Sequence, residues 1–135
     1  MMYARKWIFL LVLMLVASSC QEKKADFFER EAREYTEKHC PQQLDEFTRI
    51  DSIVYVKDNE AGDLQLFYTL TLTDEMRKVV MEKLDDIGKE DLRIVRNSPI
   101  YAKHKEYGVS FTYIYHDAER GDKIAEFHFT KKDYE

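Results

Sequence analysis

One segment alternates between large apolar residues and mostly polar ones, and it constrains the fold more than any other feature. Within residues 64–72, every second position is large and apolar: Leu64, Leu66, Tyr68, Leu70 and Leu72. A period of two places successive side chains on opposite faces of a β-strand, so these five side chains share one face. The segment therefore predicts a strand with one buried face, which another layer of the fold must cover.

The residues before this strand predict a helix and a first strand. Four residues recur at helical spacing: Phe28, Ala32, Tyr35 and His39. They predict an amphipathic helix over 26–39, with Asp26 as its N-cap and Pro41 as its stop. An irregular link then leads into a strand over 52–57, which would pair with the alternating segment.

The residues after it predict a second helix and a second hairpin. Thr73 is the expected N-cap of a helix that Gly88 ends. The last hairpin joins strands over 109–116 and 123–130, because apolar residues alternate in both segments. The fold class we expect is α+β, in the order α-β-β-α-β-β. It is a two-layer sandwich, a four-stranded antiparallel sheet with helices on one face.

The first 19 residues have the organisation of a signal peptide. The apolar run of residues 7–17 follows two basic residues and is about half as long as a bilayer-spanning helix. Small residues then stand directly before Cys20, an order that resembles the lipobox of bacterial lipoproteins. The resemblance implies that residues 1–19 are cleaved, that Cys20 is acylated, and that residues 20–25 tether the lipid to the domain. An ordinary secreted protein with a chance cysteine is the alternative.

The residue after the cysteine bears on location. In lipoproteins of bacteria with two membranes, an Asp at this place tends to retain the protein at the inner membrane. Here the residue is Gln21. The resemblance therefore implies a cell-envelope protein anchored at the outer membrane, if the organism has one.

Composition limits the kinds of partner. Without residues 1–19, 116 residues remain, and we expect residues 26–135 to form a single domain. The signal removes two basic residues, which leaves 19 Lys and Arg against 26 Asp and Glu, a net charge of about −7. Binding of nucleic acid needs a basic surface, which the chain lacks beyond the pairs 23–24 and 131–132. We therefore expect no nucleic acid partner.

Cys40 would be the remaining cysteine if Cys20 carries lipid, so it has no intramolecular disulfide partner. Its place at the end of the predicted helix over 26–39 favours a small, buried, apolar residue. A reactive thiol and an intermolecular disulfide are the alternatives, since Lys38 and His39 are its neighbours in sequence.

Motifs for catalysis or metal binding are absent from the sequence. The four histidines are His39, His104, His116 and His128. The last hairpin places His128 opposite residues 110–112, too far from His116 for both to bind one metal ion. No HxH, HExxH, CxxC or GxSxG pattern occurs. We therefore expect no catalytic residue, no metal and no cofactor. Four further aromatic residues are expected in the core or at its rim, with a ligand groove as the alternative: Phe67, Tyr101, Tyr107 and Tyr134.

Several short sequence patterns from Cys40 onward can be compared with those of other proteins. They are Cys40-Pro41, Asp45, the Thr-Arg-Ile-Asp-Ser of residues 48–52, the Tyr-Thr-Leu of residues 68–70, and the Tyr-x-Tyr-x-Asp of residues 113–117. In these patterns the chain resembles a group of small exported bacterial proteins, many of them lipoproteins. The likeness implies an exported α+β domain, and it carries no activity over to this chain.

The link before the first strand contains three charged residues: Asp45, Arg49 and Asp51. One helical turn would bring Asp45 and Arg49 together, so we expect Arg49 to act as a structural clamp. A solvated loop without fixed contacts is the alternative.

The function that we expect is a lipid-anchored, non-enzymatic envelope module. It would bind membrane lipid through Cys20, and an envelope protein or other envelope component through its exposed sheet face or the loop of residues 40–52. The alternative is a small enzyme or small-ligand carrier with a site near His39, Cys40 and Asp45.

Overall fold

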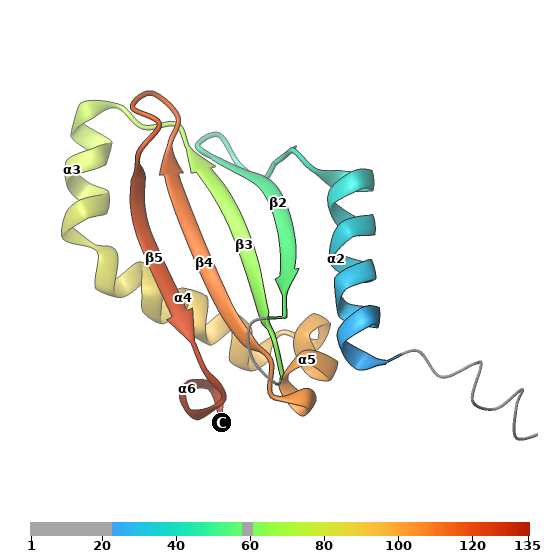
Figure 1. Ribbon diagram of the computed structural model, residues 1–135. Coiled ribbons are helices and arrows are strands. Elements are labelled where there is room, and N and C mark those ends of the chain that lie inside the picture. The colour runs from blue at the N-terminus through green and yellow to red at the C-terminus, as the bar shows by residue number, and fades with distance from the viewer. Residues whose placement is uncertain (1–22, 58–60) are drawn as a thin grey trace, which may run out of the picture.

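A computed structural model describes residues 23–57 and 61–135 (Figure 1). Cys20 and the signal segment lie outside the described residues. The elements follow one another in this order: α2 (Lys24–His39), β1 (Gln42–Gln43), β2 (Thr48–Val56), β3 (Asp63–Leu70), α3 (Asp74–Glu82), α4 (Leu84–Asn97), the 3₁₀ turn η1 (Pro99–Tyr101), α5 (Ala102–Tyr107), β4 (Ser110–Asp117), β5 (Lys123–Phe129) and α6 (Lys131–Tyr134).

The α+β class is confirmed, but the predicted four-stranded antiparallel sheet is wrong. In the described part of the chain the sheet has five strands in the order β1-β2-β3-β4-β5, and β3 pairs with β4 in parallel. The two predicted hairpins, β2–β3 and β4–β5, are present and antiparallel. The helices between the two hairpins determine the direction in which β4 pairs with β3. They return the chain to the start of β3 before β4 begins, so the two strands run parallel. The fifth strand, β1, has two residues and is too short to leave a periodic pattern.

The helices cover one face of the sheet, as predicted. In Figure 1, α4 crosses behind the strands and α2 lies beside β2. Side chains from both helices and from the strands share one core cluster, and its buried members are Phe28, Ala32, Tyr55, Leu64, Leu66, Val95, Val109, Phe111, Tyr113, Phe129 and Tyr134. The alternating segment supplies this face, with Leu66 only 1% exposed.

Strand β2 begins four residues earlier than predicted. Its register shifts between Ile50 and Ser52, so Asp51 is an extra residue that interrupts the alternation. Ile50 on one side of the bulge and Tyr55 on the other are both buried in the core face. A period-two pattern cannot be followed through such an insertion, which explains the late predicted start.

Two helix boundaries also differ from the prediction. Helix α2 begins at Lys24, so the last two residues of the predicted tether are helical, and Asp26 is not the N-cap. The carboxylate of Asp26 instead accepts a hydrogen bond from Lys57, 2.7 Å away. Thr73 is confirmed as the N-cap of α3, since its hydroxyl accepts a hydrogen bond from the backbone N–H of Met76.

Gly88 does not end a helix but lies inside α4. The helical run breaks earlier, at Lys83, between α3 and α4. A Cβ at position 88 would come within 2.9 Å of the ring of Phe127 on β5. Glycine therefore lets α4 lie directly on the sheet, a contact that the local sequence does not reveal.

The other face of the sheet turns toward the viewer in Figure 1, with no described helix in front of it. Its polar groups bind one another. The Thr112 hydroxyl donates a hydrogen bond to Asp63, 2.8 Å away, and lies 2.8 Å from Nδ1 of His128. The pairing of Thr112 with His128 confirms the register expected for the last hairpin.

Candidate binding grooves

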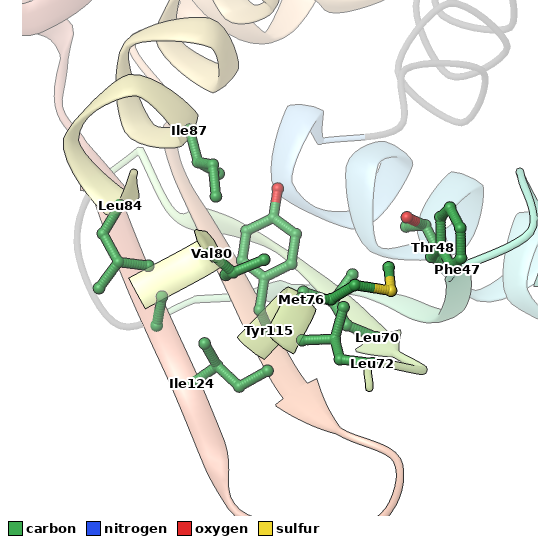
Figure 2. Close-up of a pocket in the computed structure, with 11 residues that line it drawn as sticks. Phe47, Thr48, Leu70, Leu72, Met76, Val80, Leu84, Ile87, Tyr115 and Ile124 are labelled. Carbon is green, nitrogen blue, oxygen red and sulfur yellow. The ribbon is translucent and has the colours of Figure 1, made fainter. Parts of the chain in front are cut away.

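An apolar groove lies between α3, α4 and the ends of β3 and β4 (Figure 2). Its volume is about 330 Å³. We call it groove 1, and its lining consists of Phe47, Thr48, Leu70, Leu72, Met76, Val80, Leu84, Ile87, Tyr115, Ile124 and Ala125. None of these residues carries a charge. The hydroxyl of Tyr115 points toward α4 beside Ile87 in Figure 2 and is already bound to a carboxylate of that helix.

The amphipathic pattern of α3 and α4 forms one wall of groove 1. Met76 and Val80 are one helical turn apart on α3, and Leu84 and Ile87 open α4. An ion pair fixes α3 to the end of β4, where the guanidinium of Arg77 donates to Asp117, 2.5 Å away. Both side chains are buried, and the hydrogen bond from Arg77 lowers the pKa of Asp117 to about 2.

A second groove lies on the same side of the sheet, between α2 and the η1–α5 segment. Its volume is about 490 Å³. We call it groove 2, and it is lined by Glu31, Ala32, Glu34, Tyr35, Lys38, His39, Leu44, Ile50, Ile53, Leu64, Leu66, Tyr68, Ile100, Tyr101 and His104. Its floor is apolar and aromatic, and its charged residues come from α2.

Grooves 1 and 2 adjoin on β2 and β3. The paired residues Ile50 and Tyr68 border groove 2, and the next pair on the same face, Thr48 and Leu70, borders groove 1. The ring of Tyr68 stacks on that of Tyr115, with centroids 5.1 Å apart. The two grooves therefore meet at a shared aromatic floor.

The loop between β1 and β2 contributes to both grooves. Leu44 lines groove 2 and Phe47 lines groove 1, and both side chains are about half exposed. Across groove 2, Ile100 is 78% exposed. Exposed apolar side chains that gather around a groove, as these do, are typical of a surface that binds a partner.

Two buried titratable groups lie beneath the grooves. Burial raises the pKa of Asp91 on α4 to about 6, although the hydroxyl of Tyr115 donates to it over 2.7 Å. Burial lowers the pKa of His104 to about 4, and its ring stacks on Phe28 at 4.3 Å between centroids. At neutral pH, His104 is therefore uncharged. The acidic pairs Asp85-Asp86 and Glu90-Asp91 predict a solvated helix face, and this prediction is wrong for Asp91, which is 6% exposed.

The predicted clamp between Asp45 and Arg49 is wrong. Residues 44–47 link β1 to β2 instead of forming a helical turn, and Asp45 accepts hydrogen bonds from the backbone N–H groups of Phe47 and Thr48, both 2.8 Å. Arg49 pairs with Asp51, with its Nε 2.7 Å from Oδ1. The turn thus holds Phe47 at the rim of groove 1.

Cys40 follows α2 and is partly buried. Burial raises the pKa of its thiol, with Asp51 as a smaller cause, so the protonated and less nucleophilic form is favoured. The alternative site also includes His39 and Asp45. His39 lines groove 2, and Asp45 lies in the turn between β1 and β2.

Across residues 23–57 and 61–135, no group of three or more His, Cys, Asp or Glu side chains could hold a metal ion. The same residues contain no helix that is both long and apolar enough to cross a bilayer.

Comparison with known proteins gives a family and two solved structures of similar fold. A family model described as "Domain of unknown function (DUF8479)" matches residues 23–125. A Pseudomonas aeruginosa protein described as secreted aligns with a TM-score of 0.66 at 14% identity, over 85% of this chain and 100% of that one. The pilotin EpsS of the Vibrio vulnificus type 2 secretion system aligns with a TM-score of 0.60 at 8% identity, over 79% and 87%. No curated protein matches the chain.

Proposed function

We propose a binding function for this chain, which belongs to the family described as "Domain of unknown function (DUF8479)". It is a lipid-anchored, non-enzymatic module of the cell envelope, and it holds an apolar segment of another envelope protein in grooves 1 and 2. Cys20 supplies the anchor, and the helix-covered side of the sheet supplies the binding surface.

One observation carries this proposal. Two grooves with apolar floors adjoin on one side of the sheet, and exposed apolar side chains border both of them, among them Phe47 and Ile100. Isolated exposed apolar residues are common, but a contiguous apolar surface with a groove is typical of a binding site. An extended or helical segment of a partner would bury these side chains.

The character of the grooves favours binding over catalysis. Groove 1 is lined without a charged residue, and burial disfavours the thiolate of Cys40. The proposal therefore includes no catalytic step. The likeness in fold to a secreted protein and to a secretion-system pilotin supports a place in the envelope and a protein partner by analogy alone.

Site-specific photocrosslinking tests the proposal in native membranes. A photoreactive phenylalanine replaces Phe47 at the rim of groove 1, and in a second variant it replaces Val54. These two positions are 44% and 43% exposed, but Val54 lies between the core-facing Ile53 and Tyr55 on β2 and so points to the opposite face of the sheet.

We expect a discrete crosslinked protein from position 47 and none from position 54. Adding Val80→Asp, which places a charge inside groove 1, should remove the crosslink from position 47. A crosslink from position 54 alone, or one from position 47 that Val80→Asp leaves unchanged, would show that groove 1 is not the binding surface.

A further inference from the structure

Asp91 is a buried carboxylate behind the lining of groove 1, where it contacts Tyr115. The residue is 6% exposed, and one of its oxygens accepts the hydrogen bond from Tyr115. Among the described residues, no Lys, Arg or His forms an ion pair with it, and its second oxygen, which is not among the fully buried unpartnered atoms, remains accessible. A buried carboxylate is usually paired with a cation or fully hydrogen-bonded, and in the described part of the chain Asp91 has one hydrogen bond and no cation.

The surroundings of Asp91 connect it to both grooves. Titratable side chains face it from three other elements, and Glu90 is next to it on α4; these side chains are Tyr68 on β3, Tyr101 on η1, and Tyr113 and Tyr115 on β4. Tyr68 and Tyr101 line groove 2, and Tyr115 lines groove 1.

Stability alone does not explain a carboxylate at this position. Asparagine has nearly the same shape and would accept the same hydrogen bond from Tyr115 without a buried charge. A group that is unfavourable for folding but placed beside a binding surface is typical of a functional residue. In the free protein, the carboxylate of Asp91 has no positively charged partner among the described residues.

We propose that Asp91 receives a cationic side chain of the bound partner, so that the segment held in grooves 1 and 2 is apolar with one lysine or arginine. This inference rests on the proposed binding function and adds a determinant of specificity to it.

Small probes test the inference on the full chain in a non-ionic detergent. The probe n-hexylamine imitates the stem and charge of a lysine side chain, and n-hexanol has the same chain without the charge. Binding is measured by calorimetric titration for the wild type, for Asp91→Asn, and for Asp86→Asn, which makes the same substitution at an exposed position of α4.

We expect the wild type and Asp86→Asn to bind hexylamine at least about tenfold more tightly than hexanol, and Asp91→Asn to lose this preference. The preference should also decrease as the pH falls from about 7 to about 5, since Asp91 becomes protonated there. If Asp91 is the cause, Asp91→Asn should show no such change with pH.

Two results would overturn the inference. One is equal affinity of the wild type for both probes, including no binding of either. The other is a preference for hexylamine that Asp91→Asn retains.

The photocrosslink from position 47 distinguishes failure of this inference from failure of the proposed binding function. If the crosslink forms, Asp91→Asn or added hexylamine should reduce it at least about tenfold. A crosslink that depends on Val80 but is indifferent to Asp91 would keep the binding function and exclude the cationic contact.

Discussion

The ion pair between Arg49 and Asp51 lies at the surface, at the bulge of β2. The two side chains are 47% and 30% exposed, and Asp51 also accepts a hydrogen bond from the Thr69 hydroxyl, 2.5 Å away. Exposed pairs contribute little, because solvent screens the charges and ordering long side chains opposes the attraction. We expect Arg49→Ala to lower the free energy of unfolding by less than about 1 kcal/mol.

This expectation is checked by comparing the denaturant unfolding of Arg49→Ala with that of Arg77→Ala and of the wild type. Arg77 is buried and bound to Asp117, so its removal leaves a buried carboxylate unpaired and should lower the unfolding midpoint far more. A larger effect at position 49 than at position 77 would contradict the contacts described for both residues.

The raised pKa of Asp91 makes the stability of the fold depend on pH. Between the unfolded pKa of about 4 and the folded pKa of about 6, the folded state holds a proton that the unfolded state has lost. The stabilising contribution of Asp91 is therefore present below pH 4 and is lost as the pH rises through 6.

Asp91→Asn removes this dependence while keeping an acceptor for Tyr115. Relative to the wild type, its free energy of unfolding should increase by on the order of 2–3 kcal/mol between about pH 4 and pH 7. Denaturant melts of both proteins at several pH values measure the difference, in which the contribution of His104 cancels. A constant difference across this range would mean that Asp91 is not desolvated.

At the scale of elements, the close approach of α4 to β5 depends on Gly88. In a solvent-exposed helix, Gly→Ala stabilises by about 1 kcal/mol, but here the added Cβ would press on Phe127. We expect Gly88→Ala to destabilise the domain by about 1–2 kcal/mol net. Lys89→Ala at the next, exposed position should change stability by less than about 0.5 kcal/mol.

A second substitution shows whether the ring is the cause. Combining Gly88→Ala with Phe127→Leu should destabilise less than the sum of the two single substitutions, because the smaller side chain leaves room for the methyl group. An increase in stability for Gly88→Ala alone would show that α4 does not lie as close to β5 as the structure indicates.

For the whole molecule, the anchor is predicted to reside in one cysteine. Cys20→Ala should leave the membrane fraction or remain unprocessed, because several acyl chains anchor stably and the short apolar run does not span a bilayer. Cys40→Ala is the matched control and should stay with membranes. Fractionation and mass spectrometry decide, and a Cys20→Ala protein with unchanged mass and membrane partition would refute the lipoprotein hypothesis.

Local patterns were sufficient for the longer strands and for the start of α3. The alternation of residues 64–72, the N-cap Thr73 and the two hairpins were readable because periodicity and capping act between residues near in sequence. The same patterns failed where an insertion breaks the period, as at Asp51 in β2.

What the sequence by itself determined is therefore the α+β class, the apolar face of β3 and the pairing of each hairpin. The tertiary structure alone decided the parallel pairing of β3 with β4, since a helical crossover permits either direction until the layers pack. It also decided the grooves and the burial of Asp91, because these arise where α4 meets strands about 20 or more residues away in the chain. Contacts at such separations leave no local period, so they become visible only when the chain is folded.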